Sequence, residues 1–152
     1  NLNPLITELT DARNTNQQFN PSAEDRQSIH LELNPLPNIP LRKVALKRVL
    51  DNLIENAFRY GSNHIEITTY FDNKQNRVVC KVRDFGQGIP EDSLENVFRP
   101  FSQGDSARNS GGSGLGLAIT KRIIEMHGGQ INLRNHPEEG LIAEFWLPSE
   151  GL

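Results

Sequence analysis

The 152-residue sequence predicts an α+β fold, because stretches with helical spacing of apolar residues are interspersed with stretches in which apolar residues alternate. Helical spacing occurs over 3–12, 44–60 and 115–127. Alternation predicts five strands, at 28–33, 64–71, 78–83, 130–135 and 141–147. The second and third strands flank a polar turn and the last two flank 137–140, so each pair is predicted to form a hairpin.

The first helix carries Leu5, Ile6 and Leu9 on one face, and the polar segment 14–25 after it is predicted as a loop in which Phe19 could belong to a short strand. Segment 34–40 has three prolines and is predicted as a connector. The two strongest helices are 44–60 and 115–127, and the second of these is predicted to stop at Gly128-Gly129. Between them, 85–113 contains five glycines and a short helical pattern at 92–98, which is typical of a functional loop.

Composition limits the function classes. Charged residues make up 23% of the chain, the net charge is −3 and no basic run occurs, which argues against nucleic acid as a partner. Cys80 is the only cysteine, so an internal disulfide is excluded and a reducing compartment is expected. No long apolar run appears, so this chain is not expected to insert into a membrane, although a parent protein could be anchored in one.

Two asparagines share one face of the helix at 44–60. Asn52 and Asn56 are four residues apart and lie at the border of the apolar stripe, where a carboxamide can point into a cleft. An amide oxygen suits Mg²⁺ when phosphate oxygens and water supply the other ligands. By themselves the two residues are more typical of ordinary polar residues at a helix edge, and the motifs further along the chain favour the nucleotide interpretation.

Two glycine-containing elements suggest a nucleotide. Asp84 ends a strand and precedes Phe-Gly86-Gln-Gly88-Ile89, where the glycines allow positive φ, the carboxylate can accept a hydrogen bond from an exocyclic amine, and Ile89 can contact a ring. A plain turn is the alternative. The second element, Gly111-Gly-Ser-Gly-Leu-Gly-Leu-Ala118, runs into an amphipathic helix and resembles a phosphate site rather than a linker, while the lysine-containing P-loop and the Rossmann fingerprint are both absent.

Four segments together carry a family resemblance: Asn52-Leu-Ile-Glu-Asn56-Ala-Phe-Arg-Tyr60, Asp84-Phe-Gly86-Gln-Gly88, Phe98-Arg-Pro-Phe101 and Gly112-Ser-Gly114-Leu-Gly116. They resemble the N, G1, F and G2 boxes of the catalytic ATP-binding domain of bacterial sensor histidine kinases. The runs at 104–108 and 59–61 resemble the osmosensing EnvZ type. The resemblance covers about 2–148 and implies a single catalytic domain over 1–152. Its implied fold is the two-layer Bergerat sandwich shared with gyrase, Hsp90 and MutL, a mixed, mostly antiparallel sheet of about five strands with three helices on one face.

The resemblance also implies roles for individual residues. Asn56 resembles the Mg²⁺ ligand, Asn52 and Arg59 residues beside the phosphates, Tyr60 a neighbour of the adenine or ribose, and Asp84 the adenine reader. Gly86, Gly88 and Ile89 belong to the adenine loop, and Phe98 and Phe101 resemble the aromatic residues that anchor the lid. Gly112, Ser113, Gly114, Leu115, Gly116 and Leu117 resemble the triphosphate loop. In the last hairpin Ala143 stands where many relatives carry threonine.

The implied function is to bind Mg²⁺ and ATP and to donate the γ-phosphoryl group to a histidine on a separate dimerisation and phosphoacceptor domain, for onward transfer to a response regulator. The implied parent is a homodimeric kinase of the bacterial inner membrane, with this domain in the cytoplasm. Slow hydrolysis is expected, because gyrase-type enzymes use a glutamate as general base where this chain has Asn52. His30 lies in an alternating strand and does not resemble the acceptor histidine.

Two alternatives remain at this level, a non-catalytic ATP sensor and an anti-sigma-type serine kinase on the same fold. The segment 99–112, polar and rich in glycine and serine, is expected to be a mobile lid that ATP and Mg²⁺ order, with Arg108 meeting a phosphate.

Overall fold

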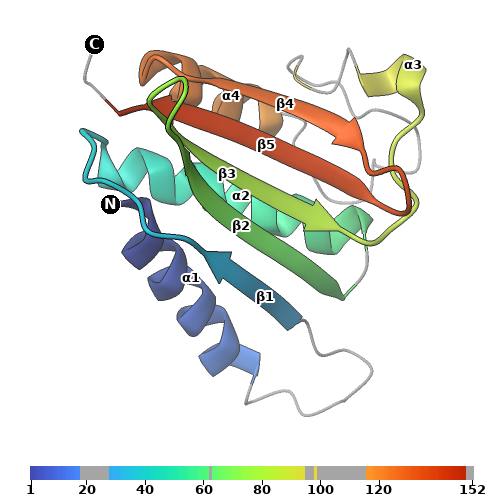
Figure 1. The fold of residues 1–152 in the computed structure, drawn as a ribbon. Coiled ribbons are helices and arrows are strands. Elements are labelled where there is room, and N and C mark those ends of the chain that lie inside the picture. The colour runs from blue at the N-terminus through green and yellow to red at the C-terminus, as the bar shows by residue number, and fades with distance from the viewer. Residues whose placement is uncertain (18–27, 62, 95–97, 99–115, 150–152) are drawn as a thin grey trace.

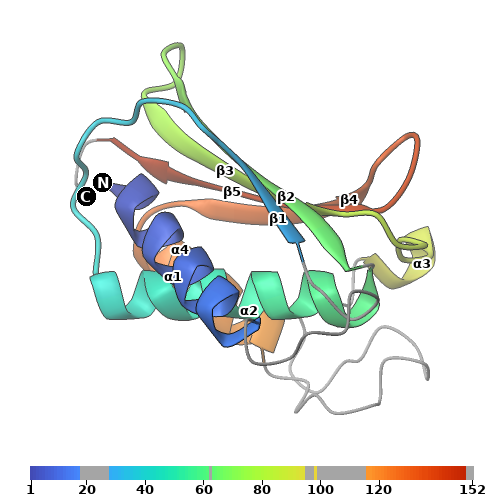
Figure 2. The ribbon, with the colours of Figure 1, turned by 90° about the horizontal axis from the view of Figure 1, so that it is seen from below.

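The computed structural model describes residues 1–17, 28–61, 63–94, 98 and 116–149. Within them the chain forms an α+β sandwich of two layers, a five-stranded sheet and a layer of helices on one of its faces (Figure 1, Figure 2). The helices are α1 (Leu2–Gln17), α2 (Lys43–Tyr60), α3 (Glu91–Leu94) and α4 (Gly116–Met126). The strands are β1 (Ser28–Leu33), β2 (His64–Asp72), β3 (Arg77–Asp84), β4 (Gln130–Asn135) and β5 (Leu141–Pro148). The predicted fold class is confirmed.

The predicted boundaries hold closely for the strands and less well for the first helix. β1 and β4 have the predicted bounds, β2 and β5 each end one residue later than predicted, and β3 is one residue longer at both ends. The loop predicted from residue 14 is wrong for residues 14–17, which continue α1. Once a helix is nucleated, each further residue adds a hydrogen bond at little cost, so it can extend beyond its apolar stripe. The predicted segment around Phe19 lies outside the described residues.

The strands lie in the order β1-β2-β3-β5-β4. β1 pairs with β2 in parallel, and every other pair is antiparallel, which includes the two predicted hairpins. This order places β3 at the centre of the sheet, between β2 and β5. Val82 of β3 and Ala143 of β5 are register partners, so their side chains lie on the same face.

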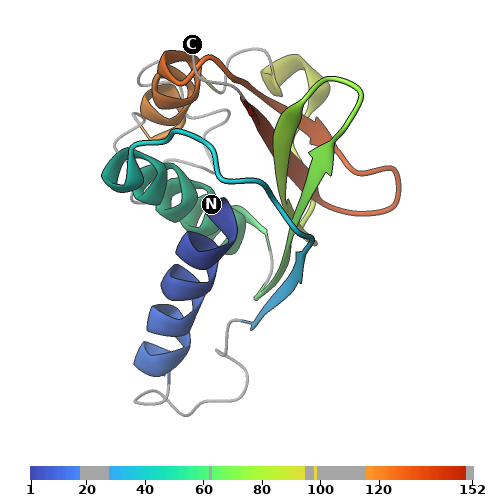
Figure 3. The ribbon, with the colours of Figure 1, turned by 60° about the vertical axis from the view of Figure 1, so that its left-hand side comes forward.

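The core lies between the sheet and the helices. α2 occupies the middle of the helical layer, with α1 on one side and α4 on the other (Figure 3). Its apolar stripe is almost fully buried, with 0–2% exposure at Leu46, Val49, Leu50, Leu53 and Ile54. On the sheet, the inward residues include Ile65, Ile67, Cys80 and Phe145, all at 0% exposure. The buried stripe of α2 therefore holds the remaining face of this helix, which bears the two asparagines, in a fixed orientation.

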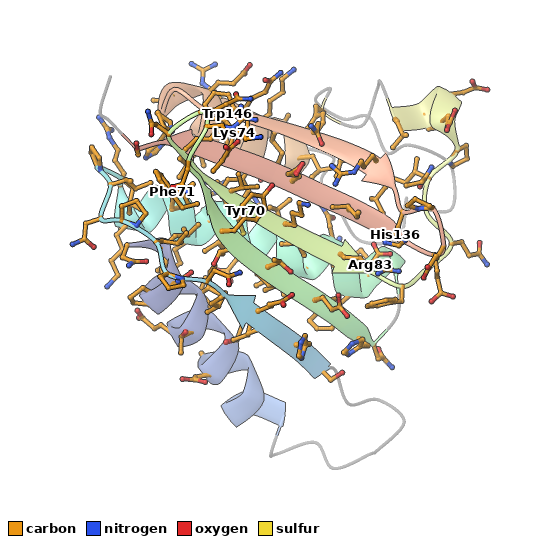
Figure 4. All side chains as sticks on the ribbon, in the orientation of Figure 1. Tyr70, Phe71, Lys74, Arg83, His136 and Trp146 are labelled. Carbon is orange, nitrogen blue, oxygen red and sulfur yellow. The ribbon has the colours of Figure 1, made fainter. Side chains whose placement is uncertain are left out.

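None of the described helices covers the opposite face of the sheet, which is viewed directly in Figure 4. It carries charged and aromatic side chains, among them Tyr70, Arg83 and Trp146. Among the described residues, no helix combines the length and the apolar character that a membrane span requires.

Candidate nucleotide-binding site

A small cavity of about 30 Å³ lies between the helical layer and one end of the sheet. Its walls come from parts of the chain that are far apart in sequence: Leu53, Asn56 and Ala57 from α2, Val82 and Asp84 from β3, Ile89 from the segment after β3, Leu117 from α4, Leu133 from β4, and Leu141 and Ala143 from β5. The walls are mostly apolar with two polar groups, Asn56 and Asp84, which is the usual composition of a small-molecule site.

The predicted position of the two asparagines at the border of the α2 stripe is confirmed. Asn52 and Asn56 are half-buried, whereas Glu55 between them is exposed. Asn56 lines the cavity. The Asn52 amide nitrogen donates to the carbonyl oxygen of Gly116 at 3.3 Å and to the hydroxyl oxygen of Thr120 at 3.2 Å. Asn52 therefore connects α2 to the first turn of α4.

Asp84 ends β3 as a buried carboxylate with 5% exposure. Its Oδ1 accepts hydrogen bonds from the backbone N–H of Gly86 at 3.0 Å and of Leu141 at 3.1 Å. The first bond closes a short turn after the strand, and the second ties that turn to the start of β5. A charge-assisted bond of this kind is stronger than a neutral one, so the carboxylate is held in a defined orientation.

Two glycines leave room for this carboxylate. A Cβ on Gly61, which follows α2, would lie 2.5 Å from the Cβ of Asp84. A Cβ on Gly140, whose φ is +90°, would clash with the carbonyl oxygen of Asp84. The end of α2 and the turn before β5 therefore pack against Asp84 so closely that neither position tolerates a side chain without movement. No sequence pattern predicted this role for Gly61 or Gly140.

The predicted adenine loop, residues 84–89, folds over the end of the β4–β5 hairpin. Gly88 has φ of +77°, as predicted, but Gly86 is not among the glycines with positive φ and contributes its N–H to Asp84 instead. Ile89 is 3% exposed and forms two hydrogen bonds with the side chain of Asn135. Asn135 was missed by the sequence analysis, because an isolated asparagine at a strand end looks like any turn residue.

The described part of the predicted phosphate element, 111–118, begins at Gly116, the first residue of α4. A Cβ at Gly116 would come within 3.9 Å of the Asn52 carboxamide, so the two elements of the site are in close contact. Thr120, one turn further along α4, is fully buried and receives the Asn52 amide. The N–H groups in the first turn of an α-helix have no partner within the helix, so the start of α4 suits an anion.

The remaining predicted residues are only partly described. Arg59 is exposed near the end of α2, and Tyr60 is the last residue of this helix. Phe98 is half-buried, and the Lys121 ammonium group of α4 lies 5.7 Å from its ring centroid. Outside the described residues lie Phe101, Arg108, Gly112, Ser113, Gly114 and Leu115, together with the predicted lid at 99–112.

Ala143 lies on the inward face of β5 and lines the cavity with 7% exposure. Its methyl group, next to Val82 and Leu133 in register, makes this wall apolar behind Asp84. Polar recognition in the described part of the cavity is thus left to Asp84 and Asn56.

A second cavity of about 350 Å³ lies at the other end of the α2–α4 pair. It is lined by Pro40, Leu41, Arg42, Ala45, Ile123, Met126, His127 and Pro148. None of the predicted site residues lies there. The His127 ring joins the two helices by accepting from the Arg42 N–H at 3.1 Å, with its other nitrogen 2.8 Å from the Ile123 carbonyl oxygen. The larger of the two cavities is therefore not the one lined by the predicted site residues.

No cluster of three or more His, Cys, Asp or Glu side chains suited to a metal occurs in the described part of the chain. Mg²⁺ bound with a nucleotide does not require such a cluster, because phosphate oxygens and water provide most of its ligands. The half-buried Asn56 carboxamide in the cavity wall supplies a protein oxygen of the required kind, so the residues present fit this ion.

Comparison with known proteins relates this geometry to a family. Residues 42–151 match the family model described as histidine kinase-, DNA gyrase B- and HSP90-like ATPase. The alginate biosynthesis sensor protein KinB of Pseudomonas aeruginosa is 40% identical over 145 residues, which are 94% of this chain and 23% of KinB. The chain thus spans about a quarter of the length of this curated relative.

Solved structures of histidine kinase domains agree with this family match. The catalytic domain of histidine kinase ThkA superimposes with a TM-score of 0.80 at 28% identity, covering 99% of this chain and 93% of that domain. ThkA is also known in complex with the response regulator protein TrrA, a structure that this chain matches with a TM-score of 0.75 at 29% identity, over 98% of this chain and 40% of that one. The histidine kinase domain of the Escherichia coli osmosensor EnvZ gives a TM-score of 0.65 at 32% identity, over 97% of this chain and 85% of that domain.

The family match covers the helix with the paired asparagines, the buried aspartate and the glycine at the start of α4, which are the residues that line or border the small cavity. The chain belongs to the histidine kinase-, DNA gyrase B- and HSP90-like ATPase family, with homologues among the sensor histidine kinases.

Proposed function

We propose that this chain binds Mg²⁺ and ATP and donates the γ-phosphoryl group to a histidine on a separate phosphoacceptor domain. The observation that carries the proposal is the small cavity, where Asn56 of α2, Asp84 of β3 and Leu117 of α4 meet. Asn56 and Asp84 belong to two of the four segments that resemble the kinase motifs, and Leu117 directly follows a third. Their convergence supports one composite nucleotide site.

The base end of the proposed site is formed by Asp84 and the apolar walls. The buried carboxylate is held by two backbone N–H groups, and it can accept a hydrogen bond from the exocyclic amine of adenine. Guanine has a carbonyl oxygen at the same ring position, which would face the carboxylate with two acceptors and no hydrogen. Ile89 and Leu141 supply apolar contact to the ring.

The phosphate end is formed by Asn56 and the first turn of α4. The Asn56 oxygen would hold Mg²⁺, and the N–H groups after Gly116 would face the phosphates. Bound Mg²⁺ neutralises phosphate charge, which is most of what phosphoryl transfer requires from its catalyst besides positioning. Asn52 is bonded to α4 and has no basic group, so water is not activated there and hydrolysis is expected to be slow.

The partners follow from the same proposal. The acceptor histidine belongs to a dimerisation domain of a longer kinase, which acts as a homodimer and passes the phosphoryl group to a response regulator. The ThkA complex with TrrA supports a regulator as partner, and the greater length of KinB supports further domains. We place the domain in the cytoplasm, as part of an inner-membrane sensor. The osmosensing type stays a prediction, since similar proteins include an alginate biosynthesis sensor as well as an osmosensor.

The deciding experiment mixes this chain with a helical-hairpin domain that carries an acceptor histidine, together with γ-labelled ATP. The expected product is an acid-labile phosphohistidine on the added domain. Binding of ATP without transfer would favour the non-catalytic sensor, and an acid-stable phosphoserine on a partner would favour the anti-sigma-type kinase. Either result overturns the proposed function.

The same assay tests the metal ligand. Asn56→Ala is expected to abolish Mg²⁺-dependent transfer while the far-ultraviolet circular dichroism stays that of the parent, because the change removes one oxygen at the cavity wall and little packing. Asn73→Ala, at an exposed position in the turn between β2 and β3, is the matched control and should leave transfer unchanged. Undiminished transfer by Asn56→Ala would contradict the assignment.

A further inference from the structure

We propose that Asn135 is a positioning residue for nucleobase binding: its side-chain amide holds the backbone of Ile89, and so fixes the apolar wall that contacts the base ring. This inference rests on the proposed function and goes beyond it, by separating the residue that fixes the wall from the one that reads the base. Asn135 is the last residue of β4 and does not line the cavity itself.

Two hydrogen bonds join the side chain of Asn135 to the backbone of Ile89. Asn135 Oδ1 accepts from the Ile89 N–H at 2.9 Å, and Asn135 Nδ2 donates to the Ile89 carbonyl oxygen at 2.7 Å. The carboxamide thus satisfies both backbone groups of Ile89, as a neighbouring strand would. Ile89 is 3% exposed, so these groups are shielded from water and depend on Asn135.

Gly88 shows how closely the loop approaches Asn135. Its φ is +77°, and a Cβ there would clash with Asn135 Oδ1. The positive φ and the missing side chain therefore serve the same purpose, because they allow the backbone to lie against the carboxamide. The sequence predicted Gly88 as a turn residue, and the structure adds a second reason for a glycine there, its close contact with Asn135.

The two functional residues of the loop have separate anchors at one place, the end of the β4–β5 hairpin. Ile89 is held by Asn135 and Asp84 by the N–H of Leu141. Asn135 and Leu141 are register partners, so they are fixed relative to each other by the hairpin. Removing the Asn135 amide releases Ile89 but leaves both hydrogen bonds of Asp84 in place.

This separation gives a specific expectation. Asp84 distinguishes adenine from guanine, whereas Ile89 contributes ring contact that any base can use. A variant of Asn135 is therefore expected to bind nucleotides more weakly and to keep the preference of the parent for ATP over GTP. Groups that contact only the phosphates should be unaffected, because within the described residues the Asn135 carboxamide bonds to Ile89 and Gly116 bonds to Asn52.

The test compares Asn135→Asp with the parent chain. Aspartate keeps an acceptor for the Ile89 N–H but places an oxygen against the Ile89 carbonyl oxygen, where the parent has a donor. Calorimetry with Mg²⁺ present is expected to show ATP affinity reduced about ten-fold, as for one buried unsatisfied polar group. The ratio of the affinities for ATP and GTP should be the same as in the parent. Binding of magnesium tripolyphosphate, followed by nuclear magnetic resonance at the Gly116 amide, should be unchanged.

Two further variants keep the test decisive. Asn73→Asp makes the same charge change in an exposed turn and should match the parent. If Asn135→Asp does not fold, Asn135→Ala removes both bonds without introducing charge and carries the same expectations. Amide hydrogen exchange at Ile89 without nucleotide should be faster in either Asn135 variant than in the parent.

The outcomes separate this inference from the function on which it rests. Unchanged ATP affinity, or equal losses for ATP and tripolyphosphate, would overturn the positioning role, as would unchanged exchange at Ile89. A parent chain that binds neither probe would refute the proposed function, and the exchange measurement would still decide whether Asn135 holds Ile89.

Discussion

The two faces of β3 place polar groups in opposite surroundings. On the face toward the helices, Cys80 and Val82 are buried and the strand ends in the buried carboxylate of Asp84. On the outer face, Lys81 and Arg83 are half-buried, and the Lys81 ammonium group is 3.9 Å from a carboxylate oxygen of Glu144 on β5. The guanidinium group of Arg83, a residue labelled in Figure 4, lies 4.3 Å from the centroid of the Phe85 ring.

The difference between the two faces indicates where a polar side chain can determine ligand binding. Asp84 is surrounded by apolar walls and held by backbone donors, so each of its hydrogen bonds acts in a medium of low dielectric constant. The outer-face charges are partly hydrated and share their partners, since Glu144 also contacts Arg134 at 2.9 Å. Such exposed pairs contribute little individually. Binding is therefore expected to depend on the inner face and to tolerate changes on the outer one.

The largest expected effect is that of Asp84→Asn. The amide keeps an oxygen for the N–H groups of Gly86 and Leu141 but opposes an NH₂ group to the adenine amine. An unpaired buried polar group costs about 1–3 kcal/mol, so ATP affinity should fall by about ten- to a hundred-fold. Calorimetry with ATP and GTP on the parent and the variant measures this loss.

Asp72→Asn is the matched control for this substitution. Asp72, the last residue of β2, also accepts two backbone N–H bonds, from Lys74 at 3.0 Å and Gln75 at 3.3 Å in the exposed turn that follows. Its variant should bind ATP like the parent. Equal affinities of the unsubstituted chain for ATP and GTP would argue against Asp84 as an adenine reader.

A second prediction concerns Cys80, whose pKa burial raises from 9.0 to about 12. The folded state therefore keeps its proton when the unfolded chain has lost it. This contribution to stability is fully present below pH 9 and is lost as the pH rises from 9 to about 12. Over that range Cys80 should lower the free energy of unfolding by up to about 1.4 kcal/mol per pH unit.

Urea unfolding of the parent and of Cys80→Ala at pH 8 and at pH 10 measures this effect. The alanine variant loses packing at both pH values, so the informative quantity is the difference between the two. The parent should lose more stability than the variant on going to pH 10. Equal losses would mean that the Cys80 thiol ionises as readily in the folded chain as in the unfolded one.

The smallest expected effect is that of Glu144→Gln on the outer face. The side chains involved are 18% exposed for Glu144, 32% for Lys81 and 45% for Arg134, so solvent screens both pairs. The free energy of unfolding should change by less than about 1 kcal/mol, and ATP affinity should not change. Urea unfolding at low and high salt, with calorimetry beside it, checks both; a loss of ATP affinity would show that the two faces are not independent.

Some features of α2 and β3 could be predicted from the sequence and others could not. Apolar periodicity predicted which residues of α2 and β3 are buried, because the side-chain repeat of a helix or a strand fixes which residues share a face. The spacing of Asn52 and Asn56 likewise placed both at the edge of the buried stripe. Residues 14–17 were missed, since a polar helical end has no apolar repeat.

The sequence alone determined the elements, the buried faces and the motif residues, because all of these follow from local chemistry and spacing. Beyond the two predicted hairpins, only the tertiary structure decided the strand order β1-β2-β3-β5-β4 and the contacts that depend on it. Alternation shows that a strand has two faces but not which strand lies beside it. Asn135 and Ile89 are 46 residues apart, and they meet because β5 lies between β3 and β4 and brings the hairpin end to the adenine loop. No sequence pattern within either segment indicates that these two residues are in contact.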